Sequence, residues 1–389
     1  MSTRPSVPPQ DFPVALSIGV MAWNEEDTIG PMLDSLFAQS IFAFLAARGE
    51  RCEVVCLANG CTDRTVAVAA ARCARAEREH PARRGLTARV ADIREPGRNH
   101  AWNLFVHEFS AREARFICLM DADIVFNRVH TVQLVLSALE HDPHLGGASD
   151  WPCKTIAGKD RPSLRERLSL ATSDMTGGIP GRLNGMMYCL RAGIARNLYL
   201  PRDLGATDDG FFKAIICTDF FREPLDATKV VSVREATHLY EPYLSVRDIL
   251  NNQKRQMIGQ TTLEVIFNYL RTLPEEDRAN LAATIRANEA RDPDWLKKLI
   301  AAHMARVRHF WQLFPGLLGF RWRRYRALRG RRRLAHLPAA LAGFAVTLIA
   351  SWRAARFLRR GIAPFWPKTG RQAPAAALLT ANPAAPHSR

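Results

Sequence analysis

The chain has 389 residues, 47% of them hydrophobic and 24% charged, a composition typical of globular proteins and unlike that of disordered or fibrous chains. Its formal net charge is +16, and this charge is unevenly spread: residues 1–300 hold 37 basic and 38 acidic side chains, whereas residues 301–389 hold 17 basic and no acidic ones. We therefore expect a nearly neutral globular part followed by a strongly basic region, which suits an anionic partner such as a nucleic acid or a membrane surface.

The eight cysteines are scattered, and no two of them have the Cys-x-x-Cys spacing of a zinc site or a redox motif. Several lie in apolar runs, where a free cysteine behaves as a small hydrophobic residue. Residues 1–12 are rich in proline and contain no apolar stretch, so we expect a disordered leader and no signal peptide. These features favour a reducing, cytosolic setting.

Strand-like and helix-like segments alternate in the first 125 residues. Short apolar runs predict buried strands at 13–23, 52–59, 87–93 and 115–124. Apolar residues at helical spacing predict helices at 24–42, 62–79 and 97–109, the first with acidic residues in its first turn. This alternation predicts an α/β fold with a mostly parallel central sheet and helices on both faces, in which ligands bind beyond the carboxyl ends of the strands.

The fourth predicted strand ends in "LMDADI", which places Asp121 and Asp123 two residues apart. On a strand, this spacing puts both carboxylates on one face. At ~4 Å they would repel each other by about 4 kcal/mol at an effective dielectric constant near 20, a cost that a divalent cation would offset. A hard cation held by one or two carboxylates can bind the phosphate oxygens of a nucleotide. A solvated strand end is the alternative interpretation.

Two further strand ends carry polar residues. The first strand runs into "MAWNEE", in which Asn24, Glu25 and Glu26 could bind a ribose or a base, or could simply cap a helix. The second runs into "LANGCTDRT", which offers Asn59. Because the three ends would open onto one edge of a parallel sheet, we expect their side chains to form one site.

Four segments occur in the order and at about the spacing seen in family 2 glycosyltransferases: "VALSIGVMAWNEEDTIGPMLDSL", "ANGCTDRT", "FICLMDADI" and "GATDDGFF". The chain resembles this family over about residues 13 to 265. The resemblance implies the GT-A fold and an inverting, metal-dependent transfer of a sugar from a nucleotide-diphosphate donor to an acceptor hydroxyl.

The resemblance also implies roles for individual residues. It implies that the nucleoside is bound by Ala22, Asn24, Glu25, Glu26, Asn59 and Asp121. Asn59 occupies the position where the family usually has the Asp that binds uracil. Asp123 would be the direct ligand of Mn²⁺ or Mg²⁺, with Asp121 nearer the ribose and His238 as a third candidate ligand.

In "TDDG", Asp209 matches the catalytic base of the family and Asp208 would steady it or contact the acceptor. From the residues alone, this segment is equally an acidic helix N-terminus. Gly185 lies in the stretch that resembles the donor and acceptor pocket, where a glycine lets the backbone approach a sugar. "NNQKRQMIGQ" keeps only Arg255 of the family's Gln-x-x-Arg-Trp motif, and Arg255 could pair with the diphosphate.

The basic region has two interpretations. Residues 295–314 predict a basic amphipathic helix that could lie in the headgroup layer of an anionic membrane. The apolar run 337–352 contains Pro338 and Gly343 and is shorter than the ~20 residues needed to span, so it favours a monotopic or re-entrant anchor. A nucleic-acid arm would use the charges but leave the apolar residues unexplained, so no nucleic-acid partner is expected. The Ala/Pro-rich segment 370–389 is expected to be disordered.

The sequence thus predicts four regions: a leader (1–12), a GT-A domain (13–270), a basic membrane-associating helical region (271–369) and a tail (370–389). The expected function is sugar transfer from a nucleotide-diphosphate sugar, with UDP-sugar favoured, at the cytoplasmic face of a membrane. The acceptor would be a lipid or a lipid-linked or envelope glycan. A non-catalytic protein that binds nucleic acid or membranes, and a nucleotidyltransferase on a similar sheet, remain alternatives. A dinucleotide dehydrogenase is excluded because no G-x-G-x-x-G follows a strand.

Overall fold

The computed structural model describes residues 12–159, 182–205, 207–243, 245–313 and 337–360, and the positions 161, 163, 166, 322, 325, 326 and 330. The expected leader, apart from its last residue, and the expected tail at 370–389 lie outside the described residues.

One eight-stranded sheet organises the chain, in the order β3-β2-β1-β4-β7-β6-β8-β5. Its strands are β1 (Val14–Ala22), β2 (Arg51–Asn59), β3 (Leu86–Ile93), β4 (Phe116–Asp121), β5 (Val125–Phe126), β6 (Gly147–Lys154), β7 (Met187–Arg191) and β8 (Val230–Tyr240). The first four strands are parallel to one another, β7 runs antiparallel to both β4 and β6, β8 is parallel to β6, and β5 closes the edge antiparallel to β8. The predicted mixed, mostly parallel α/β sheet is confirmed.

Alternate residues of the central strands enter two separate hydrophobic cores. In β2, for example, Val55 and Leu57 lie in one core, and Val54 and Cys56 lie in the other. Because both faces are covered, these strands are apolar at almost every position, which is why the sequence predicts them so well.

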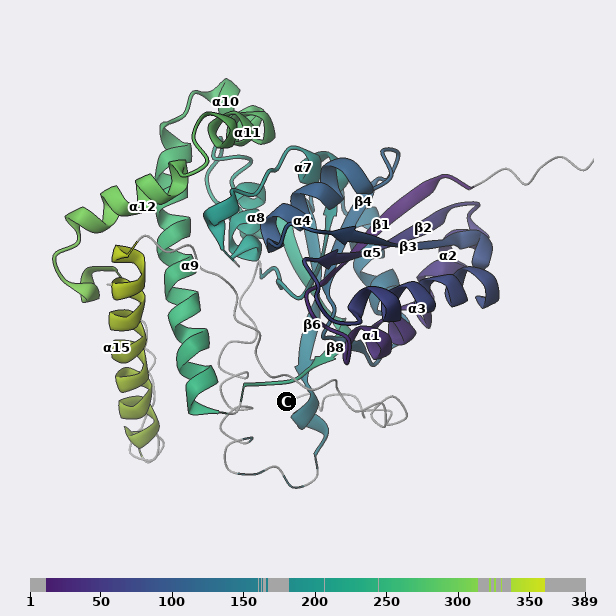
Figure 1. Ribbon diagram of the computed structural model, residues 1–389, viewed down its shortest axis with the longest axis horizontal. Helices are drawn as coiled ribbons and strands as arrows, with labels where there is room; N and C mark the ends of the chain where they lie inside the picture. Colours follow the sequence, from purple (N-terminus) through teal and green to yellow (C-terminus); the bar gives the residue numbers. More distant parts are fainter. Residues whose placement is uncertain are drawn as a thin grey trace, which may run out of the picture.

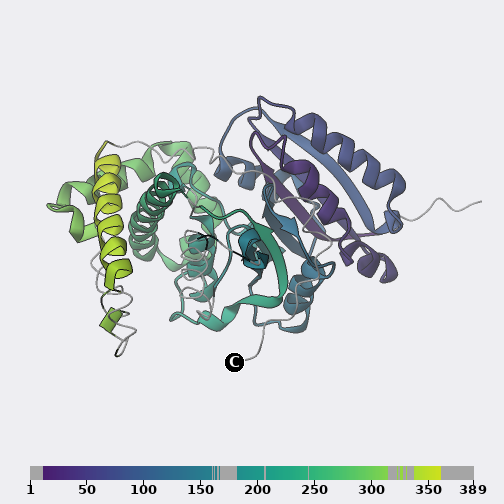
Figure 2. The same cartoon turned by 90° about the horizontal axis from the view of Figure 1, so that it is seen from below.

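Helices cover each face of the sheet (Figures 1 and 2). One core is completed by α1 (Ile29–Phe37), α2 (Ile41–Ala47), α3 (Thr65–Glu79) and α5 (Thr131–His141). The other is completed by α4 (Arg98–Leu104), a π-helical turn η2 (Phe105–Phe109), α7 (Ala192–Arg196), α8 (Asp208–Cys217) and α9 (Val246–Thr272). Short 3₁₀ turns occur at η1 (Arg83–Gly85), η3 (Thr155–Gly158), η4 (Arg202–Leu204), η5 (Ala227–Lys229) and η6 (Phe310–Leu313).

The C-terminal helices pack beside α9, away from the sheet (Figure 1). They are α10 (Glu275–Ala279), α11 (Leu281–Arg291), α12 (Trp295–Arg306) and α15 (Leu337–Arg359). The core extends across residue 270 into these helices, since Ile285 on α11, Ile300 on α12 and Ala354 on α15 belong to the same buried cluster as α9.

The amphipathic helix expected at 295–314 differs in length and environment. Helix α12 ends at Arg306. Its apolar residues, such as Leu296, Ile300 and Met304, are buried against the protein, so this face is not available to a membrane. The sequence period was correct, but an apolar stripe does not reveal which surface covers it.

The helix expected at 24–42 also differs. It begins at Ile29, with no acid in its first turn, and it is interrupted between Phe37 and Ile41. Among the described residues, Ile29–Ala47 is the one stretch long and apolar enough to cross a membrane, by length and composition only. Residues of α1 and α2 such as Ile29 and Phe42 are fully buried against the sheet, so the apolar character is that of core helices.

Candidate active site

The carboxyl ends of β1, β2 and β4 meet at one edge of the sheet, as expected. Ala22 is aligned with Ala58 at the end of β2, and Met21 is aligned with Asp121 at the end of β4. The three strands therefore end at nearly the same level of the sheet, and the polar residues that follow them begin side by side.

Asn24 joins the loops that follow β1 and β2. It adopts a left-handed backbone conformation with φ of 54°, which Asn tolerates better than most residues. Its side-chain oxygen accepts a hydrogen bond from the Thr62 N–H at 2.7 Å, and its own N–H donates to the Cys61 sulfur at 3.3 Å. The Cys61 thiol in turn donates to the carbonyl of Ala22 at 3.6 Å.

The two acids after Asn24 make similar links. The Glu25 N–H donates to the Thr65 hydroxyl at 2.7 Å, and the Glu25 carboxylate accepts from the hydroxyl of Thr28. The Glu26 carboxylate accepts from the backbone N–H and the side chain of Arg64, both at 3.2 Å. Asn24, Glu25 and Glu26 therefore fix the loop geometry at this edge. None of them is the N-cap of α1, which is Thr28, so the helix cap that the sequence offered as the alternative to nucleoside binding is not what these residues form.

Asn59, the last residue of β2, is buried, and its side-chain oxygen accepts a hydrogen bond from the Gly97 N–H at 2.9 Å. The oxygen that could accept from a base thus already holds the backbone just before α4. Its second lone pair leaves it a further acceptor position. The same bond sets where α4 begins, and hence where Arg98 lies.

Arg98 connects the two carboxylate motifs of the sequence. Its Nη1 donates to Asp121 Oδ1 at 2.8 Å, and its Nη2 lies 3.5 Å from Asp208 Oδ2 and 3.4 Å from the carbonyl of Gly185. Burial opposes the guanidinium charge, but the attraction of Asp121 and Asp208 outweighs it and raises the pKa of Arg98. Burial also raises the pKa of Asp121, aided by the charge of Asp123 and opposed by that of Arg98.

The sequence reading assigned no role to Arg98. The sequence did contain a signal for Arg98. It lies in "EPGRN", just after the carboxyl end of β3, which is parallel to β1, β2 and β4 in the same sheet. A residue at the carboxyl end of a parallel strand is a candidate for the site whatever its charge.

The expectation that Asp121 and Asp123 share one face of a strand is wrong. Strand β4 ends at Asp121, and Asp123 lies in the turn before β5. Three residues after Asp123, Phe126 pairs with His238 of β8. His238 is thus carried on the strand next to the segment that contains Asp123.

His238 is completely buried, and its Nδ1 makes a short contact with the carboxylate of Asp150. Asp150 also accepts from the Asn184 side chain at 3.1 Å. The Nε2 of His238 is buried and has no hydrogen-bond partner among the described residues. A histidine whose other ring nitrogen is held by a carboxylate is the usual arrangement of a metal ligand. Within the same described residues, no group of three or more His, Cys, Asp or Glu side chains is assembled to hold an ion.

Asp208 and Asp209 open helix α8, where the helix dipole favours negative charge. Asp208 is buried, whereas Asp209 is partly exposed and accepts a bond from the Gly210 N–H at 2.8 Å. Burial, together with the charge of Asp208, raises the pKa of Asp209 from 3.8 to about 6. A Cβ at Gly185 would lie 3.4 Å from Asp209, an ordinary contact distance, so Gly185 is a direct neighbour of this carboxylate.

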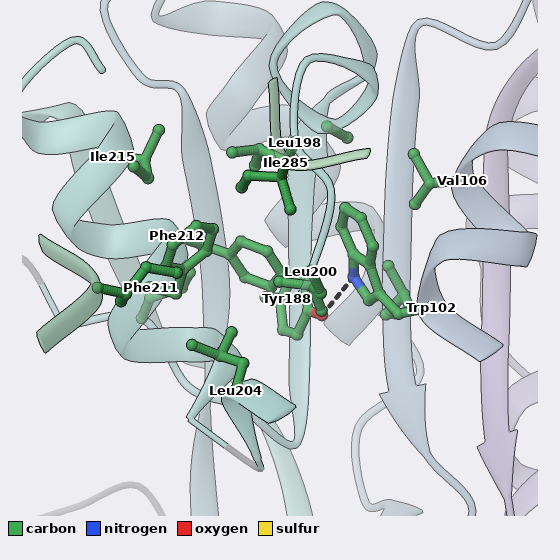
Figure 3. Close-up of a cluster of buried hydrophobic side chains, with 14 of the residues drawn as sticks. Trp102, Val106, Tyr188, Leu198, Leu200, Leu204, Phe211, Phe212, Ile215 and Ile285 are labelled. Carbon is green, nitrogen blue, oxygen red and sulfur yellow. Dashed lines mark hydrogen bonds between the residues drawn. The ribbon is translucent and has the colours of Figure 1, made fainter. Parts of the chain in front are cut away.

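A chain of hydrogen bonds supports Asp208 from inside the core. The indole N–H of Trp102 donates to the Tyr188 hydroxyl at 3.0 Å (Figure 3), and this hydroxyl lies 3.3 Å from Asp208 Oδ2. Trp102 also stacks on Phe212 of α8, with ring centroids 5.1 Å apart. Burial and the charge of Asp208 raise the pKa of Tyr188 well above its usual value, so Tyr188 remains a neutral donor.

Helix α9 packs closely against the start of α8. A Cβ at Gly259 would lie 1.8 Å from Cγ2 of Thr207, the residue before Asp208. Arg255, one turn earlier on α9, donates to Asn252 at 2.8 Å. Arg255 is therefore carried by a helix in contact with the start of α8.

Residues 17–183 match the model of the family described as glycosyl transferase family 2. No curated protein sequence matches the chain.

Two solved structures are distantly similar. One is residues 1–349 of TarS from S. aureus, with a TM-score of 0.42 and 13% identity over 90% of this chain and 92% of that one. The other is glucosyl-3-phosphoglycerate synthase from Mycobacterium tuberculosis in complex with Mn²⁺, UDP-glucose and phosphoglyceric acid. It has a TM-score of 0.42 and 13% identity over 67% of this chain and 81% of that one.

The matched segment contains the ends of β1, β2 and β4, with Asn24, Asn59, Asp121 and Asp123. The similarity to glycosyl transferase family 2 therefore extends over three of the strand ends that form the site.

Proposed function

We propose that this protein transfers a sugar from a nucleotide-diphosphate donor to an acceptor hydroxyl by a single displacement with inversion. The observation that carries the proposal is the bridge made by Arg98 between Asp121 and Asp208, beside a carboxyl group whose pKa is raised to about 6. It joins the nucleotide side of the family domain to α8, which lies outside the matched segment.

Asp209 is the general base in this proposal. A carboxylate with a pKa near 6 is ionised at neutral pH and is a stronger base than an ordinary Asp. It would take the proton of the acceptor hydroxyl as the oxygen attacks the sugar carbon and the nucleoside diphosphate leaves. Asp208, held by Arg98 and Tyr188, positions the start of α8.

Ala22, Asn24, Glu25, Glu26, Asn59 and Asp121 are proposed to form the nucleoside side of the site. The sugar would lie near Gly185, with Arg98 and Arg255 available to the diphosphate. UDP-sugars are the favoured donors.

A divalent cation, Mn²⁺ or Mg²⁺, is proposed to be held by Asp123, with Asp121 and His238 as further candidates. The buried Nε2 of His238, which has no hydrogen-bond partner in the described part of the chain, and the carboxylate at its Nδ1 fit such a ligand, whereas Asp121 is already engaged by Arg98. When bound, the cation would neutralise charge that develops on the leaving diphosphate.

The acceptor is proposed to be a lipid or a lipid-linked or envelope glycan, at the cytoplasmic face of a membrane. The 17 basic and no acidic residues after position 300 support an anionic surface as a partner.

Thermal-shift measurements on the full chain test the donor. UDP-, GDP-, CDP- and dTDP-sugars are added in turn with Mn²⁺, with Mg²⁺ or with EDTA, because a ligand that binds only the folded state raises the melting temperature. We expect a shift with UDP-sugar and Mn²⁺ or Mg²⁺ that EDTA and Asp123→Ala both remove. Absence of a shift with every donor would contradict the proposed function, and a shift unaffected by EDTA and by Asp123→Ala would contradict the metal site.

A further inference from the structure

Helix α15 has two different faces. Its inner face packs on α9 and is buried; it includes Thr347, Ala350, Ser351, Ala354 and Leu358. The Ser351 hydroxyl lies 3.2 Å from the sulfur of Met257 on α9. This face already has a protein partner.

The outer face of α15 is apolar but exposed. Leu341, Leu348, Ile349 and Trp352 are 60%, 42%, 47% and 48% exposed, respectively. They recur at helical spacing and form one stripe. Scattered apolar residues on a surface need no explanation, but a continuous stripe marks an interaction surface.

Basic residues continue the same stripe toward the C-terminal end of the helix. Arg356 and Arg359 are exposed and follow Trp352 at spacings of four and three residues. The Arg356 guanidinium lies over the Trp352 ring, 5.0 Å from its centroid. Along the helix, the stripe therefore changes from aliphatic side chains to an indole and then to cationic side chains. The sequence contains no acidic residue after position 300 that could neutralise these cations.

We infer that the outer face of α15 binds the surface of an anionic lipid bilayer, with the helix lying parallel to the membrane plane. Leu348, Ile349 and Trp352 would enter the headgroup layer, and Arg356 would contact lipid phosphates. Arg359, whose Nη2 donates to the carbonyls of Val307 and Arg308, would add positive charge close to the bilayer surface. A spanning orientation would strip α15 from α9 and expose its buried face. Nucleic acid is disfavoured because phosphate contacts leave the apolar part of the stripe uncovered.

This inference deepens the membrane location proposed above and, of the two segments expected to contact a membrane, retains α15 and excludes α12, but it does not depend on the reaction. It has a geometric consequence. Met257, which contacts α15, and Gly259, which contacts Thr207, are two residues apart on α9. One helix thus links the membrane-facing surface to the start of α8, so the bilayer would hold a fixed position relative to Asp209.

Co-sedimentation of the full chain with vesicles tests the inference, using phosphatidylcholine with and without phosphatidylglycerol. The first variant changes Leu348, Ile349 and Trp352 to Ser. Its matched control changes three exposed apolar residues outside the C-terminal helices to Ser: Val129, Leu134 and Leu225. We expect the first variant to partition at least ~10-fold less, because apolar burial is lost, and the control to bind like the native chain.

A second pair of variants tests the charges and does not alter the apolar stripe. Arg356→Gln with Arg359→Gln should weaken binding to phosphatidylglycerol vesicles by roughly 25-fold, at about 5-fold per arginine. The control, Arg78→Gln with Arg84→Gln, removes two exposed arginines of α3 and η1 and should have little effect.

Several results would overturn the inference. Native binding by the triple-serine variant would show that α15 is not the contact. If the native chain forms a dimer that the triple-serine variant does not form, a second copy of the chain covers this face. If the triple-serine variant melts at a lower temperature than the native chain in the absence of vesicles, another segment of the same chain covers it. Displacement of vesicles by DNA would favour nucleic acid. If the native chain binds vesicles but no sugar nucleotide, the proposed reaction fails while this inference stands.

Discussion

Arg98 explains how the carboxylates of the site are tolerated together. The sequence suggested that the repulsion between Asp121 and Asp123 requires a cation. The structure supplies a guanidinium on Asp121 instead, 2.8 Å away. Because the same guanidinium reaches Asp208, one residue of α4 offsets part of the negative charge from β4 and α8.

The assignment of Asp209 as the base predicts a specific kinetic result. Asp209→Asn should lower turnover by about 10³-fold and leave donor affinity nearly unchanged, because a general base acts on the transition state. In the native enzyme, kcat/KM should fall with acid below about pH 6, where Asp209 takes up a proton. Steady-state kinetics across pH, with donor binding measured separately, check both statements.

Tyr188→Phe serves as the comparison, since it removes a hydrogen bond to Asp208 without altering Asp209. It should reduce turnover by only roughly 10-fold, the worth of one bond to a charged group. Equal losses in the two variants would contradict the separate roles given to Asp208 and Asp209.

The same pKa has an opposite consequence for stability. An unfolded Asp titrates near 3.8, and folded Asp209 titrates near 6, so the folded state binds more protons between these values. Its contribution to stability is therefore complete below about pH 4 and is lost as the pH rises through about 6. Asp209→Asn should be more stable than the native chain by roughly 2–3 kcal/mol at pH 7 and show no gain at pH 4, as measured by urea unfolding. A variant that is less stable at both pH values would show that the carboxylate has a structural role.

Among the secondary-structure elements, the sequence correctly predicted the buried strands, because their burial leaves a local pattern of apolar residues. Strands β1 to β4 were predicted to within about one residue, except at the end of β4, because residues buried on both faces leave uninterrupted apolar runs. The convergence of three strand ends, with Asn24, Asn59 and Asp121, followed from the parallel arrangement alone.

The predictions were wrong or incomplete where a contact between segments far apart in the sequence determines the structure. Glu25 and Glu26 looked like the first turn of a helix, but Glu26 pairs with Arg64 across the loop and the helix begins at Ile29. Arg98 was missed because the bridge it makes spans 23 residues to Asp121 and 110 to Asp208. No local pattern encodes such a pairing.

The contact between α9 and α8 gives an element-scale prediction. Gly259→Ala places a methyl group 1.8 Å from Cγ2 of Thr207, so either the Thr207 side chain or one of the two helices must shift. Overpacking of this kind costs about 1–3 kcal/mol, partly offset by the better helix propensity of Ala. Because α8 begins at the next residue, turnover should fall together with the melting temperature.

Two further variants isolate the clash. Gly193→Ala lies on α7 with nothing within 4 Å of the added Cβ, and should leave stability unchanged or slightly improved. Adding Thr207→Ser to Gly259→Ala removes the opposing methyl and should restore most of the loss. If the double variant is no better than Gly259→Ala, the steric explanation is wrong.

For the whole molecule, the division between a neutral part and a basic part does not coincide with a division of the core. Charge changes near residue 300, and a domain boundary was expected at 270, yet buried residues of α9, α11, α12 and α15 belong to one cluster. The C-terminal helices are therefore joined by packing to the part of the chain that contains the sheet. Charge composition describes the surface and carries little information about what lies beneath it.

This continuity predicts that α15 is needed for stability even without a membrane. A chain ended after residue 336 would expose the face of α9 that contacts Ala350, Ala354 and Leu358, and should lose on the order of 3–5 kcal/mol of unfolding free energy. A chain ended after Arg360 keeps α15 and serves as the control. If both truncations melt like the native chain in the absence of lipid, then α15 is held by the membrane alone. Selective loss of stability in the shorter chain would show that the same helix completes the core with one face, leaving the other for a partner.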